Sequence, residues 1–94
     1  MRALLPLGSV VSIRGHDSLV MICGRLQLDH PTKKVYDYFA CDHPLGIVDS
    51  AQGLLFNDDA IEKIFYVGFQ DIEELSYQQS LMEYIRQQND DPVI

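Results

Sequence analysis

The chain has 94 residues, of which 47% are hydrophobic and 22% charged. So apolar a composition excludes an intrinsically disordered protein. The length suits one small domain, which we expect over residues 1–88, followed by a frayed acidic tail over residues 89–94. No apolar run approaches the roughly 18 residues that span a bilayer, and the first residues lack the apolar core of a secretion signal. We therefore expect a cytoplasmic protein without a membrane span.

Charge is distributed unevenly along the chain, whose formal net charge is −7. Residues 48–94 contain ten acidic and two basic residues. This field repels phosphate backbones, so the sequence argues against nucleic-acid binding and is compatible with a protein partner that has a basic surface. The two cysteines, Cys23 and Cys41, are expected to be free, buried thiols because no secretion signal is evident.

Strand signals fill most of the first two thirds of the chain. Runs of β-branched and aromatic residues, separated by turn-forming residues, predict strands. Gly24, inside the second run, predicts a bulge or a close backbone crossing. The expected strands cover about residues 9–14, 19–28, 34–41 and 64–69.

Between the last two of these strands lies a short apolar run, residues 54–56. Asn57 follows it and predicts the cap of one helical turn over residues 60–62. Four or five short antiparallel strands are too few for two packed sheets. We therefore expect an α+β fold, with a small, strongly bent antiparallel sheet or an SH3-like half-barrel of about four or five strands, a short helical turn and a C-terminal helix.

A helix is predicted over about residues 72–88, because Asp71 and Glu74 have the spacing of a capping box. Its apolar residues form two stripes on nearly opposite sides. Ile72, Leu75 and Met82 make the first stripe, and Tyr77, Leu81, Tyr84 and Ile85 make the second. A surface helix needs only one stripe for its own core. The second stripe is therefore expected to bind a partner or a second copy, unless the chain itself covers the helix on both sides.

Support for catalysis or metal binding is weak. The 42–53 loop is long enough to be functional, and Cys41 with His43 has the residue types of a nucleophile and its base. Cys23 and His30 would have to join these two residues from separate strands to complete a zinc site. We expect no catalytic residue, cofactor or metal. The alternative is a small enzyme or ligand-binding protein that uses the 42–53 loop and Cys41.

Several separate blocks of sequence resemble one protein family. The blocks are Leu4 to Val11, Met21 to Arg25, Tyr36-Asp37-Tyr38 with Cys41 and Pro44-x-Gly46, Phe56-Asn57 with Ile61, and Gly68-Phe69 before Glu73-Glu74. In this order they resemble the short Firmicute proteins of the domain-of-unknown-function family four-one-seven-six, over residues 4–75. The resemblance implies no catalytic residue. Members of that family tend to be encoded beside LXG-type toxins and the type VII secretion apparatus, which implies a cytosolic accessory or chaperone-like adaptor.

Within these blocks, Arg25, Tyr36 and Tyr38 allow two interpretations. In the first, Arg25 pairs with Asp37 on the neighbouring strand and the group is structural. In the second, the three side chains lie on an exposed face and act as interface anchors. We expect a non-enzymatic adaptor for a protein partner such as an LXG-type toxin. A purely structural homodimer, joined through the helix, is the other alternative.

Overall fold

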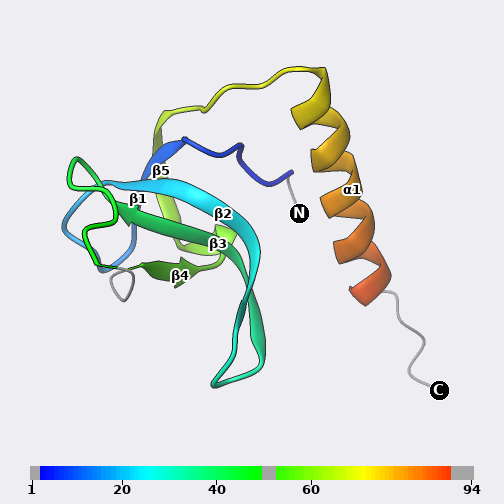
Figure 1. Cartoon of the computed structure of the whole chain (residues 1–94), viewed down its shortest axis with the longest axis horizontal. Helices are drawn as coiled ribbons and strands as arrows, with labels where there is room; N and C mark the ends of the chain where they lie inside the picture. The colour runs from blue at the N-terminus through cyan, green and yellow to red at the C-terminus, as the bar shows by residue number, and fades with distance from the viewer. Residues whose placement is uncertain (1–2, 50–52, 90–94) are drawn as a thin grey trace.

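The computed structural model of the chain describes residues 3–49 and 53–89. Within these residues, five antiparallel strands form one open sheet in the order β4-β3-β2-β1-β5, and a single long helix follows it (Figure 1). The small α+β fold is thus confirmed, with an open sheet that has β4 and β5 as its edges. The elements are β1 (Val10–Ile13), β2 (Val20–Asp29), β3 (Lys34–Asp42), β4 (Leu54–Phe56), the 3₁₀ turn η2 (Asp58–Ala60), β5 (Ile61–Tyr66) and α1 (Ile72–Asn89).

The last strand begins earlier than the sequence predicts. The helical turn expected over residues 60–62 ends at Ala60, and β5 begins at Ile61. Asn57 precedes the turn, but its side chain does not cap it. The Asn57 side-chain oxygen instead accepts a hydrogen bond from the Asp37 N–H at 3.1 Å. The turn stops there because Ile61 is already paired with Ile13 of β1.

β2 and β3 form the longest ladder of the sheet and bend at one point. Their register shifts between Ile22 and Gly24, so Cys23 is the extra residue of a bulge. This confirms the bulge predicted at Gly24. An extra residue in one strand bends it and increases its twist, which lets this short sheet curve around its own core.

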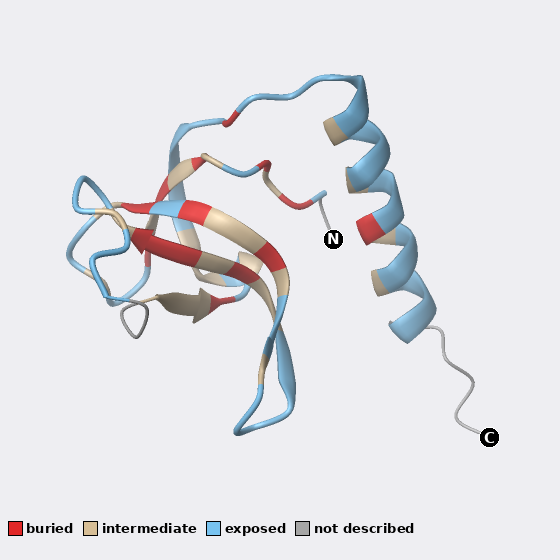
Figure 2. Cartoon of the chain, in the orientation of Figure 1, coloured by how far each residue is buried: buried red, intermediate tan, exposed pale blue. Residues whose placement is uncertain are grey.

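The core joins the sheet, the N-terminal segment and α1, and Figure 2 shows buried positions on all three. Residues 3–9 pass between the sheet and α1, and their backbone bonds to β2 through Gly8 N–H to Ile22 O and Ile22 N–H to Ser9 O, both at 2.8 Å. This segment supplies Leu4 to the core cluster, and α1 supplies Leu81. The core cluster consists of Leu4, Val11, Ile13, Val20, Ile22, Tyr38, Ala40, Phe56 and Leu81.

The helix ends close to the predicted position, at Asn89. The rest of the acidic tail expected over residues 89–94 lies outside the described residues. Within the part of the chain that the structure describes, no helix combines the length and the apolar composition needed to cross a membrane.

Candidate functional site

A buried arginine joins the sheet to the helix. Arg25 lies on β2 opposite Tyr38, and 9% of its surface is exposed. Its Nη2 donates to Glu74 Oε1 of α1 at 2.9 Å, and its Nη1 donates to Glu74 Oε2. The guanidinium carbon lies 5.1 Å from the centre of the Tyr77 ring. Because a planar guanidinium can bond bidentately and face a ring at once, this geometry requires arginine rather than lysine.

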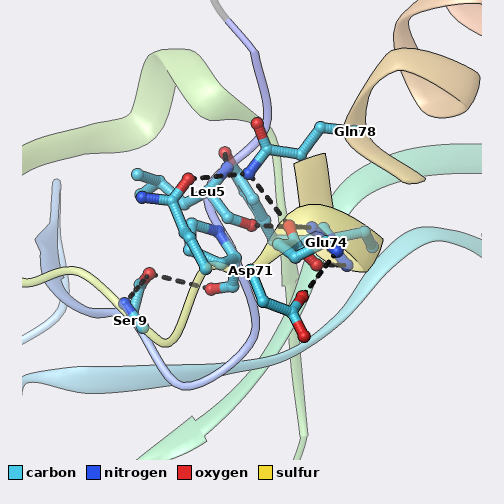
Figure 3. A network of polar contacts seen from close by, with 10 residues as sticks. Leu5, Ser9, Asp71, Glu74 and Gln78 are labelled. Atoms are coloured by element: carbon cyan, nitrogen blue, oxygen red, sulfur yellow. Dashed lines mark hydrogen bonds and ion pairs between the residues drawn. The ribbon is translucent and has the colours of Figure 1, made fainter. Parts of the chain in front are cut away.

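The partner carboxylate, Glu74, is in the first turn of α1 and has several bonds (Figure 3). Its backbone N–H donates to Asp71 Oδ1 at 2.8 Å, which confirms that Asp71 caps the helix. Gln78 Nε2 donates to Glu74 Oε2 at 2.9 Å. The hydrogen bonds from Arg25 hold the pKa of Glu74 below its ordinary value. Glu74 therefore stays ionised and bonds to Arg25 instead of completing the other half of the capping box.

Tyr38 provides a second link between the sheet and the N-terminal segment. Its side chain is fully buried, and its hydroxyl accepts a hydrogen bond from the Leu5 N–H at 2.9 Å. The same hydroxyl donates to Asp58 Oδ1 at 3.0 Å. Burial raises the pKa of Tyr38, so the phenol remains a hydrogen-bond donor at neutral pH. The Leu5 carbonyl oxygen accepts from Arg25 Nη1 at 3.5 Å, so both backbone polar groups of Leu5 bond to side chains from the sheet.

Asp37 bonds to the turn before β5 and not to Arg25. Its Oδ2 accepts a hydrogen bond from the Asp58 N–H at 2.7 Å. Burial raises the pKa of Asp37. The predicted Arg25–Asp37 pair is wrong because Arg25 lies opposite Tyr38, and successive side chains of a strand point to opposite faces.

The structure also contradicts an exposed face made of Arg25, Tyr36 and Tyr38. Tyr38 has no exposed surface, Arg25 is buried and Tyr36 is partly buried. Among the described residues, every buried side-chain nitrogen or oxygen has a hydrogen-bond partner. The polar atoms of this network therefore bond within the chain, where they hold the N-terminal segment, the sheet and α1 together.

The two thiols lie side by side on β2 and β3. The Sγ atoms of Cys23 and Cys41 are 3.3 Å apart, and both cysteines are free. Burial and the neighbouring thiol raise the pKa of Cys23 to about 11, so little reactive thiolate is present at neutral pH. His43 is exposed. In residues 3–49 and 53–89, no three or more His, Cys, Asp and Glu side chains come close enough to hold a metal ion.

The 42–53 loop, which we considered as a ligand-binding segment, is described only in part. Residues 50–52 lie outside the described residues. The described part exposes three apolar side chains, Leu45, Ile47 and Val48, with exposed fractions between 50% and 73%. Cys41 itself is 3% exposed and lies against Cys23.

The helix stripe predicted to bind another chain is divided between core and surface. Leu81 is 7% exposed and belongs to the core, and Ile85 packs against the same cluster. The expectation that these two residues face another chain is wrong, because the open sheet uses them to cover its own apolar face. Tyr77 and Tyr84 remain about half-exposed, at 52% and 48%. On the other stripe, Ile72 is 83% exposed.

β5 and the residues after it expose a run of apolar side chains, and the strand is coloured almost entirely as exposed in Figure 2. We name these residues the β5 surface: Ile64, Phe65, Tyr66, Val67 and Phe69, with exposed fractions between 40% and 78%. Sequence reasoning placed a strand here but missed its exposure. The sequence does contain a signal for this exposure, because successive residues of the strand are apolar. Such a strand has apolar side chains on both of its faces, and both faces must be covered if they are to be kept from water.

The β5 surface continues toward the start of α1. A shallow hollow there is lined by Leu7, Phe69, Asp71, Glu73, Glu74 and Tyr77. Apolar side chains of the N-terminal segment and of the β5 surface thus lie beside carboxylates of the first helical turn. Glu74 is paired with Arg25, so the exposed carboxylates beside this hollow are those of Asp71 and Glu73.

Comparison with known families matches residues 4–77 to the family described as Domain of unknown function (DUF4176). The chain belongs to the DUF4176 family. No curated protein and no solved structure matches it. In this DUF4176 chain the matched segment contains the whole sheet and the part of α1 that carries Glu74 and Tyr77, and it ends before Leu81.

The sequence blocks of the resemblance map onto the buried network of this DUF4176 chain. The block with Gly24 supplies Arg25, the tyrosine block supplies Asp37 and Tyr38, and the helix block supplies Glu74. Each of these residues bonds to a residue far away in the sequence. Their role in this DUF4176 chain is therefore to fix the fold.

The Gly68-Phe69 block has a packing role that only glycine can fill. The Gly68 N–H donates to Ser9 Oγ at 2.9 Å, and a Cβ atom at this position would lie 2.0 Å from the Leu7 carbonyl oxygen. Close contact between two backbone segments leaves no room for a side chain. Gly68 thus serves structure, whereas Phe69 of the same block is 78% exposed and belongs to the β5 surface, which is the candidate functional site.

Proposed function

We propose that this DUF4176 chain is a non-enzymatic adaptor that binds another protein through the β5 surface. The observation that carries the proposal is the run of apolar side chains with 40–78% of their surface exposed. Neighbouring apolar side chains in contact with water mark protein-interaction sites, since their removal from water is favourable. Phe65, Tyr66 and Phe69 are aromatic, and aromatic side chains are frequent among the residues that contribute most to binding.

The use of buried polar groups within the fold also supports binding rather than catalysis. Arg25 is bonded to Glu74, and Tyr38 is bonded to Asp58. Cys41, the thiol that an enzyme with the 42–53 loop would use, is 3% exposed and lies against Cys23. A function that relies on surface complementarity fits these observations better than one that needs an activated side chain.

We further propose that the partner is an LXG-type toxin, which the adaptor binds in the cytoplasm in a chaperone-like manner before type VII secretion. This part of the proposal rests on the family resemblance. The net charge of −7 supports a partner with a basic surface.

Co-expression of the full chain with an LXG-type toxin tests the proposal. We expect the two proteins to elute together in size-exclusion chromatography. The double substitution Phe65→Lys and Phe69→Lys should weaken the complex at least about tenfold, because it places two charges where apolar contacts are needed. The control is Val35→Lys, at an apolar position on β3 that is 49% exposed and is separated from β5 by two strands.

Two outcomes would contradict the adaptor. One is a wild-type chain that elutes without the toxin at micromolar concentrations. The other is a complex whose affinity is the same in the Phe65 and Phe69 double variant and in the Val35→Lys control. A wild-type chain that elutes alone as a dimer, and becomes a monomer only in the Phe65 and Phe69 double variant, would favour the structural homodimer.

A further inference from the structure

The sheet has two edges that differ in length. β4 contains three residues and offers few backbone hydrogen bonds to another strand, whereas β5 contains six residues. β5 has no proline, and its two charged residues, Glu62 and Lys63, precede the apolar run that begins at Ile64. Natural proteins protect edge strands by shortening them, by adding charge, proline or bulges, or by covering them. Over the residues that the structure describes, β5 is neither short nor covered, since all of its residues after Ile61 are exposed.

The outer side of β5 carries backbone groups without a strand partner. In the part of the chain that the structure describes, β5 pairs only with β1. An antiparallel strand directs N–H and C=O groups to both of its sides, so the side away from β1 offers a row of donors and acceptors. Register shifts leave Glu62 and Phe65 without a partner residue on β1. Such bulges re-aim side chains and are frequent beside functional sites.

We propose that the outer edge of β5 pairs with an extended segment of the partner protein, which adds a sixth strand to the sheet. This inference rests on the proposed function and names the chemistry that its partner must have. The β5 backbone supplies hydrogen bonds, and the β5 surface supplies contacts for alternate side chains of the incoming strand. Opposite Phe65 and Tyr66, β-branched or aromatic residues fit best, because these pairs stabilise neighbouring strands.

Charge around β5 selects a basic strand over a second copy of this chain. Residues 58–74 contain six acidic residues and one basic residue, Lys63. Two exposed acids flank the strand in the sequence, Asp59 two residues before β5 and Asp71 five residues after it, although Arg14 donates to the Asp59 carbonyl oxygen. Two copies of β5 in antiparallel pairing would place the start of one against the end of the other, so these acidic ends would repel. A strand with lysine or arginine at both ends meets opposite charge at each.

A peptide titration followed by NMR tests the inference on the full, isotope-labelled chain. The probe is a synthetic peptide of alternating valine and threonine with two lysines at each end. We expect the largest chemical-shift changes at the amides of residues 61–66, together with slower hydrogen exchange of the amides on the outer side of β5. The matched control is the same peptide with alternate amides N-methylated, which keeps the side chains but removes the hydrogen bonds of one edge. It should bind at least about tenfold more weakly.

Each remaining outcome decides against the proposal. Equal binding by the methylated peptide would show side-chain contact without strand pairing. Chemical-shift changes centred on α1 would place the peptide contact on the helix. If the peptide at millimolar concentration leaves the amide shifts of residues 61–66 unchanged, it does not bind β5. Protection of β5 amides without peptide, together with a dimer in sedimentation, would identify a second copy as the occupant.

The toxin complex separates this inference from the adaptor function. If Ile64→Lys leaves a folded chain that no longer binds the peptide but still elutes with the toxin, the adaptor stands and strand addition is wrong. If the peptide binds β5 as expected but the toxin does not elute with the chain, the adaptor proposal with that partner is wrong. The amide spectrum of the variant shows whether it is folded.

Discussion

Arg25 and Glu74 form a charged pair in surroundings with little water. Their side chains are 4% and 13% exposed. Moving a charge from water into a buried position costs free energy. The attraction between Arg25 and Glu74 offsets this cost only while both side chains are present. Loss of one partner leaves the other charge buried without its counterion. The stability of the contact between sheet and helix therefore depends on both residues together.

Arg25→Ala should lower the free energy of unfolding by about 3 kcal/mol, because Glu74 would lose its bidentate partner. Arg25→Lys should recover only part of this loss, since an ammonium cannot make the same two bonds or face the Tyr77 ring in the same way. Urea denaturation of each variant measures the effect. The control is Arg86→Ala, which removes an exposed pair with Glu83 and should leave the stability nearly unchanged. An Arg25→Ala variant as stable as the control would contradict the role of the pair.

The contribution of Glu74 should depend on pH. Its pKa in the folded chain is below the ordinary value of 4.5, so its ionised form stabilises the fold. This stabilisation is complete above the ordinary pKa and disappears as the pH falls through the lower folded value. The stability difference between the wild type and Glu74→Gln should therefore be constant near neutral pH and shrink as the pH falls below about 4.5. Denaturation curves at a series of pH values measure this difference. A difference in the free energy of unfolding that increases as the pH falls would contradict the prediction.

Sequence identified Arg25 as a special residue but not its partner. A carboxylate on the neighbouring strand, Asp37, was the nearest candidate in the chain. The actual partner is 49 residues away, in a helix whose position over the sheet no local pattern specifies. Glu74 had a sufficient local explanation as part of a capping box. Pairings between distant elements depend on packing, which periodicity does not encode.

At the scale of elements, α1 attaches to the sheet by few residues. Leu81→Ala should lower the free energy of unfolding by about 2–3 kcal/mol, because it opens a cavity where the helix meets the core. Leu75→Ala, at a position 51% exposed, should change it by less than about 0.5 kcal/mol. Thermal and urea denaturation of the two leucine variants form a matched comparison. Equal effects would mean that α1 does not pack through Leu81.

The connection between β5 and α1 depends on one glycine. Gly68→Ala should cost about 2 kcal/mol or more, since the new Cβ would overlap the backbone of Leu7. Gly24→Ala is the control, because there the Cβ meets only the flexible side chain of Gln27, at 3.2 Å. Its expected cost is below about 1 kcal/mol. A thermal midpoint equally changed in both variants would contradict the close contact at Gly68.

Helix periodicity revealed both apolar stripes of α1 but not which one the core would use. A stripe of leucine and isoleucine and a stripe with two tyrosines are both suitable for packing. The choice follows from Arg25, which binds Glu74 and Tyr77 and so sets the rotation of the helix about its axis. The strands were easier to predict because turns bound them on both sides. The exposure of β5 followed from strand order, which the sequence pattern left open.

The whole molecule combines an exposed strand edge with strong negative charge. The net charge is −7 at pH 7, and like charge keeps copies apart in solution. Near the isoelectric point, about pH 4.6, this repulsion disappears while the β5 edge remains open. Static light scattering should therefore rise as the pH falls from 7 toward 4.6.

Phe65→Lys should reduce this rise more than Val35→Lys does, although both variants add the same charge. The reason is that a lysine on an exposed edge strand opposes pairing between edges, whereas Val35 lies away from β5. Dynamic light scattering at matched protein concentrations compares the two variants. Identical scattering from both would show that self-association near the isoelectric point involves another surface.

The bonds of residues 4–9 also determine when the protein can finish folding as it is made. Leu5 bonds to Tyr38, 33 residues later, and Ser9 bonds to Gly68, 59 residues later. During translation the N-terminal segment leaves the ribosome first, yet its partners are synthesised late. The nascent chain therefore holds an unfinished sheet until the ribosome has made Gly68 and the start of α1. A protein that binds the β5 surface would therefore meet a finished binding site only after the ribosome has made Gly68 and the residues that follow it.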